Sequence, residues 1–196
     1  MKRFATADPH FGHANIIKHC GRPFSSVEEM DQVMIDNINE VVMPNDELYV
    51  IGDFAFRGAK PKVYLDRINC KKVILVLGNH DLGDNSAFYK VYPYLELKKT
   101  ELTNEEGRKL NIVLFHYPMR SWNWSFHGSY HLFGHVHNNK HYDKSRELSL
   151  NVGVDCHDFK PLSFEDIHKI MQNKDWKNPK MIRNRSMTEN YGGTSD

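Results

Sequence analysis

Two histidines separated by one valine end the segment HLFGHVH, residues 131–137. In an extended chain, residues two apart project from the same face, so we expect the imidazoles of His135 and His137 to point the same way. Imidazole nitrogens are frequent metal ligands. The pair alone fits an ordinary exposed strand end equally well, so a metal site requires ligands from elsewhere in the chain.

Four other apolar runs also end in side chains that can bind a metal. With the histidine pair they give seven oxygen or nitrogen donors: Asp8, His10, Asp53, Asn79, His116, His135 and His137. Ligands in open α/β sheets bind beyond the carboxyl ends of strands, so we expect these side chains to converge. Each segment alone could be a turn or a loop start, but five together favour the metal interpretation. Seven donors exceed one tetrahedral site and suit two ions that share a bridging carboxylate.

The apolar runs alternate with helical patterns in the first half of the chain and dominate the second half. Strands are predicted at residues 2–7, 47–53, 71–81, 110–118, 129–135 and 148–155. Helices are predicted at 25–42, where Ser26 and Glu29 form a capping box, at 60–69 and at 163–174. This order predicts an α/β sandwich with a mixed sheet in one domain, residues 1–174. A polar tail at 175–196 receives no function.

Composition excludes several classes of protein. The chain has 196 residues with 26 basic and 25 acidic side chains, a near-neutral balance that disfavours bulk binding of a polyanion. Three scattered cysteines predict neither a disulfide framework nor a zinc knuckle. The scattered cysteines favour a reducing, cytoplasmic location. No long apolar run follows the basic N-terminal residues, so we expect no signal peptide and no membrane contact.

Five segments in fixed order, ADPH, IGDF, LGNHD, FHYP and GHVH, resemble the DxH–GD–GNH[DE]–H–GHxH pattern of the calcineurin-like metallophosphoesterase superfamily. The match runs from Asp8 to His137, and the later segment NVGVD with the last helix resembles the family's closing elements. The segment HFGHANII…GRPF is similar to a small bacterial or phage subgroup that has no cap domain. The resemblance implies an α/β fold, a four-layer α/β/β/α sandwich with mixed sheets.

The resemblance also implies a ligand set for two divalent metal ions. The first ion would be held by Asp8, His10, Asp53 and His137. The second would be held by Asp53, Asn79, His116 and His135, so that Asp53 bridges and a hydroxide between the ions attacks phosphorus. Mixed imidazole, carboxylate and amide donors favour Mn²⁺, with Fe, Ni²⁺ and Zn²⁺ as alternatives, over Ca²⁺.

His80 is the expected catalytic residue beside the bridging Asp53, because the family's histidine at this position stabilises the phosphoryl group or protonates the leaving oxygen. A hydrogen-bonded structural histidine is the alternative. The family's protein Ser/Thr phosphatases read GDxxDRG, whereas this chain reads GDFAFRG and has Phe56 in place of the orienting Asp. Asp81 is a possible substitute, and a protein-phosphatase role is disfavoured.

Substrate contacts are expected from loops near these ligands. Arg57 and Arg120 are candidates to bind phosphate, although Arg57, as a lone loop arginine, could equally be solvated. The segment 116–131 adds polar and aromatic candidates, with core or lid packing as the alternative: Trp122, Trp124, Phe126, His127 and Tyr130. Three residues of an earlier loop are candidates for the rim of the site: His13, Asn15 and Arg22.

Taken together, these features predict a dinuclear-metal phosphoester hydrolase that cleaves a small phosphodiester or nucleotide-derived substrate. A phosphomonoesterase is the alternative within the enzyme class. A nuclease acting on DNA ends, or any binding of long nucleic acid, is disfavoured by the short, near-neutral chain. A non-catalytic metal-binding scaffold for protein partners is the alternative from another class, but it predicts degraded ligands, and here all of them and His80 are present. The sequence leaves the oligomeric state open.

Overall fold

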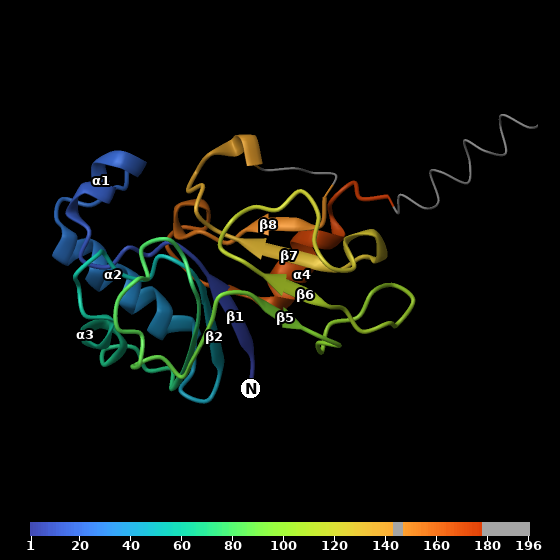
Figure 1. Cartoon of the computed structure of the whole chain (residues 1–196), viewed down its shortest axis with the longest axis horizontal. Helices are drawn as coiled ribbons and strands as arrows, with labels where there is room; N and C mark the ends of the chain where they lie inside the picture. The colour runs from blue at the N-terminus through green and yellow to red at the C-terminus, as the bar shows by residue number, and fades with distance from the viewer. Residues whose placement is uncertain (143–146, 178–196) are drawn as a thin grey trace, which may run out of the picture.

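Two mixed β-sheets lie at the centre of the molecule (Figure 1). The computed structural model describes residues 1–142 and 147–177. The first sheet has the order β4-β3-β2-β1-β9, with bounds β1 (Arg3–Thr6), β2 (Glu47–Ile51), β3 (Lys72–Val76), β4 (Lys90–Tyr92) and β9 (Leu162–Ser163). The second has the order β5-β6-β7-β8, with bounds β5 (Leu95–Leu97), β6 (Ile112–Leu114), β7 (Tyr130–Phe133) and β8 (Ser149–Asn151). Only β9 and β5 run antiparallel to their neighbours among the described strands.

Alternating side chains of the first sheet divide the apolar residues into two cores. Phe4 and Leu48 face a core that also holds the helices α1 (Ala14–Cys20), α2 (Val27–Val41) and α3 (Pro61–Leu65). Their chain neighbours Ala5 and Tyr49 face a second core between the sheets, to which α4 (Phe164–Gln172) contributes. The period of two residues in each strand therefore buries both faces of this sheet, and the α/β sandwich is confirmed.

The two long helices begin as the sequence predicts. The Ser26 hydroxyl accepts a hydrogen bond from the Glu29 N–H at 3.1 Å, while the Glu29 carboxylate accepts from the Ser25 N–H and hydroxyl. In a capping box the Glu29 carboxylate would accept from the Ser26 N–H, whereas here it accepts from Ser25. Ser163 caps α4 in the same way, accepting from the Asp166 N–H at 3.1 Å. Such caps satisfy N–H groups that the helix itself leaves free.

Several short elements were not predicted because they lack a periodic pattern. Helix α1 has seven residues and no side-chain cap, and β4, β5 and β9 have only two or three residues each. Three 3₁₀ turns, η1 (Ser125–His127), η2 (Lys140–Tyr142) and η3 (Val154–Cys156), also escaped prediction. The predicted tail lies outside the described residues from position 178 onward.

The described part of the chain contains no helix with the length and apolar character that a membrane crossing requires.

Candidate metal centre

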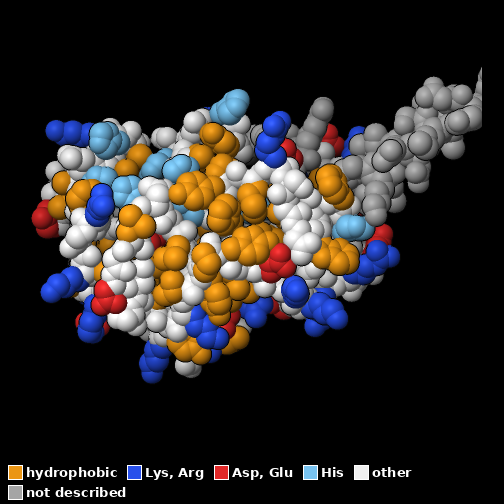
Figure 2. Space-filling model, viewed as in Figure 1, with side chains coloured by type: hydrophobic (Ala, Val, Ile, Leu, Met, Phe, Trp, Pro, Cys, Tyr) orange, Lys and Arg blue, Asp and Glu red, His pale blue; other side chains and the backbone are white. Residues whose placement is uncertain are grey.

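The loops that carry the predicted ligands all leave the carboxyl ends of parallel strands. Strands β1, β2 and β3 are parallel neighbours in one sheet, and β6 and β7 are parallel neighbours in the other. Main-chain hydrogen bonds then join the loops to one another: the Asp8 N–H donates to the Gly52 carbonyl at 3.1 Å and the Gly134 N–H to the His116 carbonyl at 3.0 Å. The His135 N–H also donates to the Asp8 carboxylate at 2.8 Å, which connects the loops of the two sheets, and histidine side chains gather on this face (Figure 2).

Left-handed backbone turns bring the ligands together. Five of the seven predicted ligands have a positive φ between 50° and 70°: Asp8, His10, Asp53, His135 and His137. This conformation is uncommon outside glycine and costs of the order of 1–3 kcal/mol per residue. The extended geometry expected for His135 and His137 is therefore wrong, because β7 already ends at Phe133. The side chains converge through tight turns, and such strain is typical of functional sites.

Two glycines allow the closest approaches between these loops. A side chain at Gly78 would collide with the Asp53 carboxylate and its backbone, and one at Gly134 would collide with Ala7 and the Asp8 carboxylate. The sequences LGNHD and FGHVH therefore need glycine before the donor residues for steric reasons.

A first cluster consists of Asp8, His10 and His137, whose donor atoms lie within 4.8 Å of one another. The side chains of Asp8 and His10 are almost completely buried, and the His10 and His137 rings stack with centroids 5.3 Å apart. Among the described residues, one Asp8 carboxylate oxygen (Oδ1) and both His10 ring nitrogens have no hydrogen-bond partner. Buried polar atoms without partners are rare, and a cation would satisfy Asp8 Oδ1 and the unprotonated nitrogen of His10.

A second cluster consists of Asp53, His116 and His135, again with donor atoms within 4.8 Å. His116 Nδ1 donates to the Ile51 carbonyl at 2.9 Å, because a carbonyl oxygen only accepts. This bond turns His116 Nε2 toward the Asn79 side-chain oxygen at 3.2 Å and Asp53 Oδ2 at 3.5 Å. A cation that replaces the Nε2 proton of His116 would have three electron-pair donors facing it: this nitrogen, the Asn79 oxygen and Asp53 Oδ2.

Asp53 lies between the two clusters. Its Oδ2 atom is 3.6 Å from His10 Nε2 on one side and 3.5 Å from His116 Nε2 on the other. The carboxylate is buried, and its second oxygen accepts a hydrogen bond from the His80 N–H at 2.8 Å. One carboxylate oxygen is thus within reach of donors from both clusters, which is the position that a bridging ligand requires.

Burial and neighbouring groups shift the pKa values of these donors in different directions. Burial raises the pKa of Asp8 to about 7 and lowers that of His10 to about 3. Burial acts to raise the pKa of Asp53, but the hydrogen bond and charge of His116 outweigh it and lower this pKa to about 2. The neutral His10 ring and the ionised Asp53 carboxylate are the protonation states that metal ligands need.

His80 joins a third group of donors with His10 and Asp53, also within 4.8 Å. Its ring is half-buried and meets the His10 ring edge-on, with centroids 5.1 Å apart. Among the contacts of the described residues, none joins Asp81 to the His80 ring. Its carboxylate instead accepts from the main-chain N–H groups of Asp53, Phe54 and Gly78 at 2.7–3.0 Å. Asp81 therefore holds the Asp53 loop against the His80 loop.

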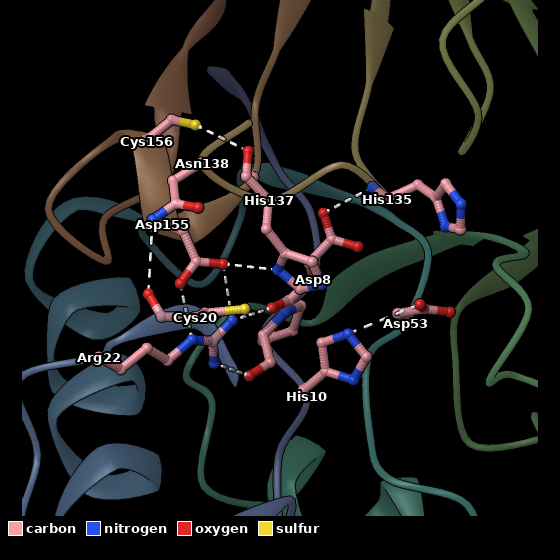
Figure 3. A network of polar contacts seen from close by, with 12 residues as sticks. Asp8, His10, Cys20, Arg22, Asp53, His135, His137, Asn138, Asp155 and Cys156 are labelled. Atoms are coloured by element: carbon pink, nitrogen blue, oxygen red, sulfur yellow. Dashed lines mark hydrogen bonds and ion pairs between the residues drawn. The ribbon is translucent and has the colours of Figure 1, made fainter. Parts of the chain in front are cut away.

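A buried charge network lies behind the first cluster (Figure 3). Asp155 contacts His137 Nδ1 at 2.7 Å and pairs with the Arg22 guanidinium, whose side chain is 0% exposed. Burial acts to lower the pKa of His137, but the Asp155 hydrogen bond outweighs it and raises this pKa to about 10. The expectation that Arg22 lies at the rim is wrong, and Asp155 was missed as a functional candidate, although it ends the segment NVGVD that the sequence resemblance covers.

The predicted substrate residues fall in two different regions. Arg57 is exposed and lines a hollow of ≈ 210 Å³ together with Phe56, His80 and Leu82, beside the donor groups. Arg120 lines a smaller hollow of ≈ 50 Å³ that also includes Phe133 and Glu147.

The aromatic residues of the segment 116–131 lie mostly away from the donors. Trp122 packs on His131, and its indole N–H donates to the Ser129 carbonyl at 3.1 Å. Ser129 precedes the first residue of β7, whereas the donor loop follows its last residue. Trp124 and Phe126 are exposed in the same region, where the Trp124 ring lies 5.0 Å from that of His127. The buried Tyr130 bonds to His168 through its hydroxyl.

Tyr117 is a neighbour of the second cluster that residue spacing alone does not single out. It directly follows His116, and its ring lies edge-on to His116 and His135 with centroids 5.0 Å and 4.7 Å away. The side chain is 39% exposed, so it offers an accessible aromatic surface at the second cluster. On the other side, the His13 ring stacks on Phe56 with centroids 4.1 Å apart, while Asn15 is exposed in α1.

Comparisons with known proteins agree with this geometry. A family model described as calcineurin-like phosphoesterase matches residues 1–155. An uncharacterized protein of Methanocaldococcus jannaschii is 34% identical over 180 residues, a match that covers 87% of this chain and 92% of that protein. The crystal structure of a protein of unknown function from Aquifex aeolicus is similar with a TM-score of 0.66 and 25% identity, covering 86% of this chain and 98% of the other.

Proposed function

The chain belongs to the calcineurin-like phosphoesterase family, and on that premise we propose that it hydrolyses a small phosphodiester or nucleotide-derived substrate with two divalent metal ions. Membership supports metal-dependent phosphoester hydrolysis in general. The observation that carries the dinuclear proposal is the position of Asp53 Oδ2, 3.6 Å from His10 Nε2 and 3.5 Å from His116 Nε2. No other described carboxylate has donors of both clusters at these distances.

In this proposal the two clusters divide the ligands between the ions. Asp8, His10, Asp53 and His137 would hold the first ion. Asp53, Asn79, His116 and His135 would hold the second. The mixture of imidazole, carboxylate and amide donors favours Mn²⁺, with Fe, Ni²⁺ or Zn²⁺ as alternatives. Within the described residues, Asp8 Oδ1 and the His10 ring nitrogens are buried without partners, and this supports the assignment because a cation satisfies the carboxylate oxygen and the unprotonated nitrogen.

The chain's own residues have separate roles around the ions. Bound divalent ions supply a water-derived nucleophile at neutral pH and positive charge that stabilises the phosphoryl oxygens. His80 would donate a hydrogen bond or proton to the leaving oxygen, since its ring borders both the His10–Asp53 pair and the ≈ 210 Å³ hollow. Asp81 would keep the Asp53 and His80 loops in register through its main-chain hydrogen bonds.

The substrate proposal follows from charge and shape. A net charge of +1 does not favour a long polyanion. The hollow beside His80 offers Arg57 for an anionic oxygen and Phe56 and Leu82 for apolar groups. Tyr117 offers a ring on which a base can stack. A small phosphomonoester is the alternative substrate, and the complete donor set argues against a non-catalytic scaffold. The chain's three free cysteines support a reducing compartment such as the cytoplasm.

Hydrolysis of bis(p-nitrophenyl) phosphate beside p-nitrophenyl phosphate tests this proposal. The protein is stripped of metal, reloaded with Mn²⁺ and compared with Asp53→Asn. We expect metal-dependent cleavage of the diester and a loss of about 10³-fold in the variant, because both ions lose a ligand. Activity of the variant equal to the parent in excess Mn²⁺ would contradict the bridging role. Faster cleavage of the monoester would favour the alternative substrate class.

A further inference from the structure

We propose that Arg22 and Asp155 are positioning residues for the first metal ion, and that one buried guanidinium holds its ligands from two distant segments in place. The inference rests on the proposed dinuclear function and adds to it a reason why the first cluster is preformed. Asp8 and His137 are 129 positions apart in the chain, yet Arg22 contacts the Asp8 backbone directly and His137 through one carboxylate (Figure 3).

The first contact is with the strained turn that carries Asp8 and His10. One guanidinium nitrogen of Arg22 donates to the Asp8 carbonyl at 2.8 Å and another donates to the Pro9 carbonyl at 2.9 Å. Asp8 and His10 both have a left-handed backbone, with φ of 56° and 52°. Such a turn persists only where its surroundings fix it, and the two hydrogen bonds supply that constraint.

The second contact is with Asp155. Arg22 Nε donates to Asp155 Oδ1 at 2.7 Å, and Arg22 Nη2 donates to Oδ2 at 3.0 Å. The side chains are 0% and 3% exposed, so this bidentate pair is shielded from water. Breaking it would leave an uncompensated buried charge, and the carboxylate is therefore fixed in direction.

The third contact joins Asp155 to His137, the proposed metal ligand. Asp155 Oδ2 lies 2.7 Å from His137 Nδ1 and accepts a hydrogen bond from its N–H. The tautomer and ring orientation of His137 are thereby set, and Nε2 remains as the nitrogen available to a cation. Carboxylates behind metal-bound histidines characteristically act in this way, and their loss costs about 10- to 100-fold in metal affinity.

The same arrangement argues against a separate metal site at Cys20, His137 and Asp155. Donor atoms of these three residues also lie within 4.8 Å of one another. Both Asp155 oxygens already accept from Arg22, however, and a metal ion beside the guanidinium would be repelled by its charge. We therefore expect Asp155 to orient His137 and not to bind a metal ion directly.

Counting the bound metal tests the proposal. The parent protein and the variants Arg22→Gln, Arg22→Lys and Asp155→Asn are loaded with Mn²⁺, dialysed against a weak chelator and analysed for manganese. We expect two ions per parent chain and one per variant chain, with the missing ion returning at roughly 10- to 100-fold higher free Mn²⁺. Arg22→Lys should show the smaller defect, because it keeps the charge but cannot form the bidentate pair. Variants that keep two ions with parental affinity would overturn the proposal.

A matched control separates positioning from stability. Asp46 is also a buried carboxylate, and it accepts from the main-chain N–H groups of Lys2 and Met43 near the amino end of β2, away from the donors. Asp46→Asn should bind two ions like the parent. A single ion in this control would overturn the proposal, since general destabilisation would then explain the loss. Circular dichroism verifies folding, and Asp155→Asn, which keeps its shape, carries the test if Arg22→Gln does not fold.

The number of ions bound by the parent protein shows whether the dinuclear function or only the positioning role fails. If it binds fewer than two ions, the dinuclear function fails and the positioning role fails with it. If it binds two and the variants also bind two, only the positioning role fails.

Discussion

The two donor clusters on either side of Asp53 differ in the groups that stand behind them. In the first, His137 is backed by the buried Asp155–Arg22 pair, and Asp8 and His10 are at most 2% exposed. In the second, His116 is backed by the neutral Ile51 carbonyl, and Asn79 and His135 are exposed. A first ion would thus enter a rigid, shielded site, whereas a second would lie near solvent and substrate. We therefore predict that the first cluster retains its ion more firmly than the second.

Among variants that should keep both ions bound, we expect the largest loss of turnover from His80→Ala. His80 touches neither backing group, and its ring borders His10 and Asp53. We expect turnover of the diester to fall by about 10²- to 10³-fold, because a proton or hydrogen bond to the leaving oxygen is lost.

Elemental analysis of the same His80→Ala sample provides the check, and two manganese ions should remain. If the variant loses an ion in parallel with activity, His80 belongs to the ligand set and its assigned role is wrong.

The second prediction concerns the two carboxylates in the absence of metal. The pKa of Asp8 is raised by burial to about 7, from an ordinary value of 3.8. Between these values the unfolded chain has released this proton and the folded chain has kept it, so stability falls as pH rises through this window. Metal-free Asp8→Asn should therefore be more stable than the metal-free parent at pH 8, by up to about 4 kcal/mol.

Urea unfolding at pH 4 and pH 8 measures this difference. The advantage of Asp8→Asn should be small at pH 4 and should reverse after Mn²⁺ is added, because only the parent gains the full binding free energy. Asp53→Asn should show no such advantage, since the pKa of Asp53 is lowered, to about 2. An equal gain in both variants would show that burial of Asp8 is not the cause.

The smallest effect is expected in the rate at which each bound ion exchanges with free metal. His135→Ala removes a ligand from the exposed cluster, and His137→Ala removes one from the shielded cluster. The ion that His135→Ala retains should exchange with free metal about 10- to 100-fold more slowly than the ion that His137→Ala retains, because only the first cluster keeps its Asp155 backing. Chelator-competition kinetics compare the two, and equal rates would remove the distinction between the clusters.

Much of this centre could be predicted from residue order. The donors follow apolar runs, and parallel strands place the ends of such runs at one edge of a sheet. The reason given for the histidine pair was nevertheless wrong, because His135 and His137 converge through left-handed turns, and no periodic pattern reveals a positive φ outside glycine.

Other features could not be predicted because they depend on tertiary contacts alone. The sequence context of Arg22 is that of a solvent-facing loop residue. Its burial depends on Asp155, which lies 133 positions later in the chain. Tyr117 lies beside the second cluster because its ring contacts His135 from another loop. Trp122 instead packs toward the opposite end of β7. The strands β4, β5 and β9 are too short for their pattern to differ from that of a loop.

A crystal structure of the Mn²⁺-loaded protein, with anomalous scattering recorded at the manganese edge, tests the central claim most directly. We predict two anomalous peaks, one among Asp8, His10 and His137 and the other among Asn79, His116 and His135, with the Asp53 carboxylate contacting both. A single peak, or two peaks of which only one contacts Asp53, would contradict the account.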